Sequence, residues 1–168
     1  MILGIMSDSH GDADATARAV ALLESRGAQM LFHCGDIGSE TVLDVLYGHN
    51  VYFVWGNCDD PPATMRAYVT KTLGLPWPQV PVRLVLDGKR IAMYHGHERE
   101  FRRGLSEEGV DYVFYGHTHV YTDQCIGRVR AINLGALYRV RVKTVALLDL
   151  ATEVATFLTL DGQSVQQP

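Results

Sequence analysis

The sequence predicts an α/β protein in which two mixed sheets pack face to face, with helices on the outside. Three observations predict this fold. Apolar runs alternate with helical patterns in the first third, a hairpin signal opens the second half, and short strands then follow with little helix. The 168 residues suffice for one domain with a sizeable core. We therefore predict a single domain over residues 1–162 and a frayed tail over 163–168.

The first third predicts three strands separated by two helices. The strands are apolar runs rich in β-branched or aromatic residues, at Ile2–Met6, Gln29–His33 and Val51–Trp55. The first helix is predicted over Asp12–Arg26, where apolar residues repeat at helical spacing: Ala13, Ala17, Val20 and Leu23. Asp12 and Asp14 favour its start and Gly27 its end. The second helix is predicted over Ser39–Tyr47, with Ser39 as N-cap. This alternation predicts a parallel sheet.

The second half predicts a different arrangement. Asp87-Gly88 lies between the strand-like runs Val82–Leu86 and Arg90–Tyr94 and indicates a hairpin. Glu98–Glu108 predicts a charged, exposed helix. Further strands are predicted at Tyr112–Tyr115 and Val142–Leu150. The proline-rich stretch Asp59–Pro81 predicts a long connection with a short helix around Met65–Leu73.

Composition excludes several classes of protein. The net charge of −4 argues against a nucleic-acid polymer or an anionic membrane as partner, and leaves room for a small phosphorylated substrate. No apolar run approaches the roughly 20 residues of a membrane span, and no secretory signal is visible, so we expect a cytoplasmic protein. Three cysteines without a C-x-x-C spacing favour free thiols. The sequence leaves the oligomeric state open, and a homo-oligomer is compatible with it.

Metal-ligand residue types follow five of the strand-like runs. They are Asp8-Ser9-His10, Gly35-Asp36, Gly56-Asn57, His95-Gly96-His97 and Gly116-His117-Thr118-His119. Because ligands bind at the carboxyl ends of strands in open α/β sheets, we expect these five ends to converge. Carboxylate, imidazole and amide donors favour Mn, Fe, Zn or Ni over calcium. The adjacent glycines allow sharp turns and close approach of the backbone.

The five motifs, in this order, resemble the signature of the calcineurin-like metallophosphoesterases. The resemblance extends over about Ile2–Asn133. Within the family, the sequence is similar to the small single-domain branch described as YfcE-like phosphodiesterases. The resemblance implies a four-layer α-β-β-α sandwich with a binuclear metal centre between the sheets. It implies one metal held by Asp8, His10, Asp36 and His119, and a second held by Asp36, Asn57, His95 and His117. Asp36 would bridge two divalent ions, with manganese favoured.

This resemblance implies a two-metal phosphodiesterase. A hydroxide that bridges the metals would attack the phosphorus of a small phosphodiester, and the cations would stabilise the phosphate oxygens as charge builds. The physiological substrate, the metal, and the preference for monoesters or diesters stay open.

One motif departs from the family pattern. Many members carry G-N-H-[DE], whereas this chain has Gly56-Asn57-Cys58-Asp59, so the general acid is unassigned. His97 and Asp59 are our candidates for catalytic residues that help the leaving group. The same departure motivates an alternative, in which a weak or inactive domain of this fold acts as a protein-interaction module. A nuclease is a third alternative, which the −4 charge disfavours.

Other residues have two interpretations each. His33 could orient Asp36 or be a core histidine, and His97 could contact substrate or support a ligand. Asn133-Leu134-Gly135 could lie near the site or form an ordinary turn. The cluster Arg99, Arg102 and Arg103 could contact substrate, although a solvated helix face is favoured.

Overall fold

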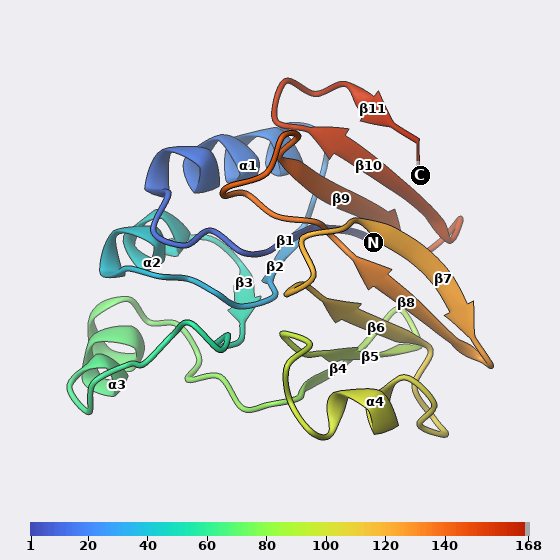
Figure 1. Ribbon diagram of the computed structural model, residues 1–168, viewed down its shortest axis with the longest axis horizontal. Coiled ribbons are helices and arrows are strands. Elements are labelled where there is room, and N and C mark those ends of the chain that lie inside the picture. The colour runs from blue at the N-terminus through green and yellow to red at the C-terminus, as the bar shows by residue number, and fades with distance from the viewer. Residues whose placement is uncertain (167–168) are drawn as a thin grey trace.

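Two mixed sheets form the centre of the computed structural model, which describes residues 1–166 (Figure 1). The first sheet contains β1 (Ile2–Met6), β2 (Met30–His33), β3 (Val51–Phe53), β9 (Thr144–Asp149), β10 (Val154–Thr159) and β11 (Ser164–Val165), in the order β11-β10-β9-β1-β2-β3. The second contains β4 (Val82–Leu86), β5 (Lys89–Met93), β6 (Tyr112–Tyr115), β7 (Thr122–Ile126) and β8 (Val129–Asn133), in the order β4-β5-β6-β8-β7. Both sheets mix parallel and antiparallel pairs, as predicted.

The core is divided into three apolar clusters that follow the layers. One cluster draws residues such as Leu3, Phe32 and Phe114 from both sheets and fills the space between them. A second lies between the first sheet and the helices α1 (Ala13–Ser25) and α2 (Glu40–Leu46). A third packs α4 (Phe101–Gly104) on the second sheet. This arrangement confirms the predicted four-layer sandwich, although the outer layer over the second sheet is one short helix (Figure 1).

The first half of the chain folds as predicted. β1 pairs in parallel with β2, and β2 with β3, through crossovers that carry α1 and α2. The Asp12 side chain caps α1 by accepting from Ala15 N, and Ser39 caps α2 by accepting from Val42 N. One detail of the helical spacing was wrong. Ala17 is exposed, whereas Ala19 is buried against the sheet.

The prediction of a helix over Glu98–Glu108 was wrong in its length, because only Phe101–Gly104 is helical. The Glu98 carboxylate accepts hydrogen bonds from the backbone N–H groups of His95 and Gly96, so it belongs to the preceding loop. At the other end, Gly104 lies under the Tyr94 ring, where a Cβ would be 2.6 Å from its Oη. Close packing at a residue of low helix propensity therefore limits the helix to one turn.

The remaining elements agree in part with the predictions. The hairpin at Asp87-Gly88 joins β4 and β5, and the short helix near Met65 is α3 (Met65–Ala67), which continues as a π-helical turn over Tyr68–Thr72. The predicted frayed tail over 163–168 was wrong at Ser164–Val165, because these residues pair with β10 and extend the first sheet. Residues 167–168 lie outside the described part of the chain.

Candidate metal centre

The carboxyl ends of β1, β2, β3, β5 and β6 converge on one side of the two sheets. Backbone hydrogen bonds connect the loops that follow these strands: Asp8 N donates to Gly35 O, His10 N to Asp36 O, and Gly116 N to His95 O. The loops therefore hold one another in place before any ligand binds. All seven side chains that the motifs singled out project from these loops.

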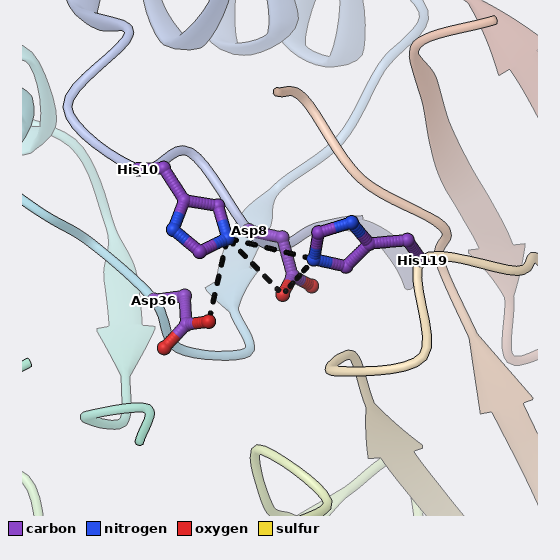
Figure 2. A group of neighbouring side chains, drawn as sticks. All are labelled: Asp8, His10, Asp36 and His119. Carbon is purple, nitrogen blue, oxygen red and sulfur yellow. Dashed lines mark hydrogen bonds and ion pairs between the residues drawn. The ribbon is translucent and has the colours of Figure 1, made fainter. Parts of the chain in front are cut away.

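Four of the seven side chains form a closed group (Figure 2). One ligand atom from each of Asp8, His10, Asp36 and His119 lies within 4.8 Å of all the others. His10 Nε2 is 3.4 Å from Asp36 Oδ2, and His119 Nε2 is 3.1 Å from Asp8 Oδ1. Both carboxylates are buried, and the two imidazoles are partly open to solvent. This group could hold a metal ion, and we call it the first set.

The other three side chains are Asn57, His95 and His117, and with Asp36 they make the second set. His95 Nε2 is 3.4 Å from Asp36 Oδ2 and 3.0 Å from Asn57 Oδ1. The His117 ring packs edge-on against His95, with centroids 5.1 Å apart. The second set is more open, because Asn57 and His117 are exposed. Among residues 1–166, the first set alone brings three or more histidine or acidic ligand atoms to within 4.8 Å.

The donor atoms of both sets fit a cation better than they fit one another. His95 Nδ1 is 2.7 Å from the Cys34 carbonyl, which can only accept, so Nδ1 carries a proton and Nε2 is the ring atom that faces the oxygens of Asp36 and Asn57. With a cation bound, His95 would be neutral and would present the lone pair of Nε2 to it. In the first set, Asp8 Oδ1 is buried and has no hydrogen-bond partner among the described residues. A divalent ion at each place would satisfy these acceptors.

Burial and neighbouring groups shift the pKa values of three of the site residues. Burial raises the pKa of Asp8, against the lowering effects of the Ser7 hydroxyl and the imidazoles of His95 and His119. For Asp36, burial works against ionisation, but hydrogen bonds from His95 and Cys58 N hold its pKa well below the usual range. Burial and the nearby His95 lower the pKa of His117, which keeps this imidazole neutral and able to donate a lone pair.

The backbone is strained at most of these residues. Five of the eight described non-glycine residues with positive φ belong to the motifs, and these five are Asp8 (56°), His10 (44°), Asp36 (54°), His117 (68°) and His119 (60°). Such a conformation costs about 1–3 kcal/mol for a residue with a side chain, so the surrounding structure must compensate. The left-handed turns aim successive side chains at the same point, which an extended backbone could not do.

The glycines beside the ligands act mainly by leaving room. A Cβ on Gly56 would lie 2.0 Å from Asp36 Oδ1, and a Cβ on Gly116 would lie 1.9 Å from Ser7 Oγ. At the fifth motif, His117 and His119 themselves adopt the left-handed turn, and Gly116 permits the close approach of its loop to the Asp8 loop.

Several residues that the motifs do not single out hold the first ligand loop in place. Ser9 Oγ lies 2.7 Å from His33 Nε2 and accepts from the Thr16 hydroxyl, which ties the first ligand loop to β2 and α1. His33 is fully buried, and burial lowers its pKa to about 3. It thus forms a neutral core anchor for the loop, and its side chain bonds to Ser9, not to Asp36. No ligand spacing in the sequence marks Ser9 or Thr16.

Two further residues hold the other loops. The Glu98 carboxylate binds the backbone of His95 and Gly96, as described above. Asn133, which is fully buried, donates from Nδ2 to Gly116 O at 2.7 Å and to the Thr118 hydroxyl at 3.0 Å. Of the two interpretations of Asn133-Leu134-Gly135, the structure therefore favours a place next to the site.

Comparison with known proteins places this geometry in a family. Residues 1–153 match the model of the calcineurin-like phosphoesterase superfamily domain. The chain belongs to the calcineurin-like phosphoesterase superfamily. It is 30% identical to phosphodiesterase YfcE of Escherichia coli K12 over 98% of this chain and 95% of that protein. It is 25% identical to phosphodiesterase MJ0936 of Methanocaldococcus jannaschii, over 89% and 93% of the two chains.

A solved structure agrees with the assignment of the fold. The structure of an archaeal phosphodiesterase superposes with a TM-score of 0.84 at 22% identity, and covers 95% of this chain and 99% of that one. The chain is therefore a metallophosphoesterase, and both the predicted fold and the predicted enzyme class, a metal-dependent hydrolase of phosphate esters, are confirmed. No helix within residues 1–166 has the length and hydrophobicity needed to cross a membrane.

The two residues that we predicted to help the leaving group lie in different surroundings. His97 is exposed, and its ring centroid is 5.3 Å from that of His95 and 6.3 Å from that of His117, so it borders the second set. The Asp59 carboxylate accepts from the backbone N–H groups of Ile37, Gly38 and Gly56 at 2.8–3.0 Å. Asp59 thus joins two ligand loops, a positioning role that the sequence did not indicate.

The cysteines and arginines near the motifs of this metallophosphoesterase have no side-chain role at the metal centre. Cys58 is exposed, and partial desolvation of its thiol together with the nearby Asp36 carboxylate raises its pKa, so it is protonated at neutral pH. Cys34 is buried, and it serves the site through its carbonyl oxygen. The side chains of Arg99, Arg102 and Arg103 are exposed to solvent, as the favoured interpretation had it.

Proposed function

We propose that this metallophosphoesterase is a two-metal phosphodiesterase in which Asp36 bridges the ions. The observation that supports it most strongly is the position of Asp36 Oδ2, which is 3.4 Å from both His10 Nε2 and His95 Nε2. A carboxylate between two imidazoles, each from a different ligand set, is suited to hold two cations close together. The proposed ligands are those of the two sets: Asp8, His10, Asp36 and His119, and Asp36, Asn57, His95 and His117.

The residues divide the work between them. Two divalent ions, when bound, would supply Lewis acidity toward the phosphate and a water of lowered pKa as the nucleophile. The chain's own part is to orient them. The Cys34 carbonyl fixes the tautomer of His95, Ser7 and His117 N hold Asp8 Oδ2, and Cys58 N holds Asp36 Oδ1. These contacts leave the remaining donor atoms aimed inward.

The leaving group receives little help from the chain. Cys58 replaces the histidine of the common motif, and Asp59 is engaged by three backbone amides. His97 remains as the proposed proton donor, because it is the exposed imidazole beside the second set. We therefore expect diesters with acidic leaving groups, such as nitrophenol, to react fastest.

The test is hydrolysis of bis(4-nitrophenyl) phosphate by protein stripped with a chelator and then reloaded with manganese. We expect no turnover in the stripped protein and restored turnover after reloading. Iron, zinc and nickel are tested beside manganese, because the donor set fits each of them. Absence of turnover with all four metals, in protein that binds them, would favour the non-catalytic interaction module instead.

A further inference from the structure

A cavity of about 230 Å³ opens beside the metal centre, between the start of α2, the end of β3 and the start of α3. Two of the residues that line it, Ile37 and Cys58, follow the metal-ligand motifs directly in sequence. Gly38, which also lines the cavity, touches the first ligand loop, because a Cβ there would lie 2.5 Å from Gly11 N. A group bound in the cavity would therefore be adjacent to a phosphate held at the centre.

The walls of the cavity include apolar side chains and one aromatic ring, that of Trp55. They include the side chains of Ile37, Leu43, Trp55, Pro62 and Met65. The volume is below the about 300–1,000 Å³ of pockets for drug-sized ligands, which restricts the occupant to a small group.

The charge at the rim is negative. Glu40, Asp59 and Asp60 line the cavity, whereas none of the described residues that line it is Lys, Arg or His. The Asp59 carboxylate is neutralised in part by three backbone N–H groups. Glu40 and Asp60 are exposed and make no hydrogen bond or ion pair within the described part of the chain. An anionic group would be repelled here, and a cationic group would be attracted.

A phosphodiester contains two alcohols, one of which leaves on hydrolysis while the other stays bonded to phosphorus. We propose that this cavity binds the alcohol that stays bonded, and that this alcohol carries an ammonium group. The proposal rests on the proposed function. The aromatic ring of Trp55 and the unpaired carboxylates of Glu40 and Asp60 can together attract an ammonium or quaternary ammonium group. A second phosphate on this side of the substrate would be disfavoured. Glu40 also lies in the first turn of α2, where a carboxylate stabilises the helix, so its role must be tested by ligand preference.

The experiment compares two diesters that differ in one atom. They are 4-nitrophenyl phosphocholine and 4-nitrophenyl 3,3-dimethylbutyl phosphate, in which a carbon atom replaces the ammonium nitrogen. We expect kcat/KM to be about tenfold higher for the choline ester. In the double variant Glu40→Gln, Asp60→Asn this ratio should fall toward one. A ratio is used because a general effect of the lost charges on the metal ions cancels in it.

The control variant is Glu108→Gln. Glu108 is an exposed acid that precedes β6, at the opposite end of that strand from His117, and this variant should keep the ratio of the unaltered protein. Equal rates for the two esters would overturn the cavity proposal and leave the proposed function intact. Hydrolysis of neither ester would overturn both.

A second measurement does not depend on turnover. In ¹H–¹⁵N spectra, titration with choline should shift the indole resonance of Trp55 to saturation, whereas 3,3-dimethylbutanol should not. The double variant should lose the shift. An unperturbed Trp55 resonance at saturating choline would contradict the proposal.

Discussion

The two ligand sets differ in how completely the chain builds them. The first set has two buried carboxylates and two imidazoles, all four with strained left-handed backbone. The second has an amide in place of one carboxylate, and two of its side chains are exposed. They share Asp36, so the difference between them comes from the other residues. For the proposed two-metal centre, the comparison favours a first site that is organised in advance and a second that closes on its metal.

The largest expected effect follows loss of the shared ligand. Asp36→Asn should lower kcat/KM by at least about a thousandfold, because several kcal/mol of charge stabilisation are lost at both ions. Metal content measured by mass spectrometry should fall with activity. Retention of both ions in this variant would show that Asp36 is not the ligand that the two sets share.

The next prediction distinguishes the two sets. His10→Asn should weaken the tightest manganese-binding step by about 10–100-fold, whereas His95→Asn should weaken only the later step. Calorimetric titration of chelator-stripped protein resolves the two steps. His49→Asn is the matched control, since His49 pairs with Glu24 at the surface. The same loss in both ligand variants would show that the sets do not differ in strength.

A smaller effect is expected from the loop contacts of the second set. Glu98→Gln leaves one of the two backbone N–H groups of His95 and Gly96 opposite an amide NH₂, so the loop shifts. We expect kcat/KM to fall by about tenfold, with weaker binding of the second metal and unchanged binding of the first. Glu108→Gln again serves as control. An equal loss for both glutamate variants would point to a general charge effect.

The smallest effect concerns the anchor of the first ligand loop. The pKa of His33 is lowered from 6.5 to about 3 by burial, so the folded protein keeps this imidazole neutral. Below pH 6.5 the unfolded chain binds a proton at His33 that the folded chain does not, and stability is lost as the pH falls toward 3. Between pH 6.5 and 5.5 this amounts to about 1 kcal/mol.

Urea unfolding of metal-free protein at several pH values measures this loss, with His33→Gln as the reference. The difference in unfolding free energy between the two proteins should shrink as the pH falls. A constant difference across that range would mean that His33 does not titrate as its burial predicts.

The sequence was informative where chemistry and periodicity agree. Helix caps such as Asp12 and Ser39 and the Asp87-Gly88 hairpin depend on local residue types, and the structure bears them out. It was less informative where a tertiary contact decides. β7 and β10 are partly exposed and carry polar residues, so no buried run marks them, and α4 is shortened by packing of Gly104 under Tyr94.

The same division applies to the site. Ligand types can be identified from spacing, but the left-handed turns at His117 and His119 cannot, because they depend on contacts made by Asn133 and Asp8. The positioning roles of Glu98 and Asp59 likewise arise from backbone groups that only the folded chain brings near. Sequence patterns therefore indicate which side chains are candidate metal ligands, and tertiary contacts decide how those side chains are oriented.

The most direct test of the account is an anomalous diffraction experiment at the manganese edge on crystals of the manganese-loaded protein. We expect two peaks, one on each side of the Asp36 carboxylate and about 3.5–4 Å apart, with the stronger in the first set. A single peak, or peaks that do not share Asp36, would contradict it.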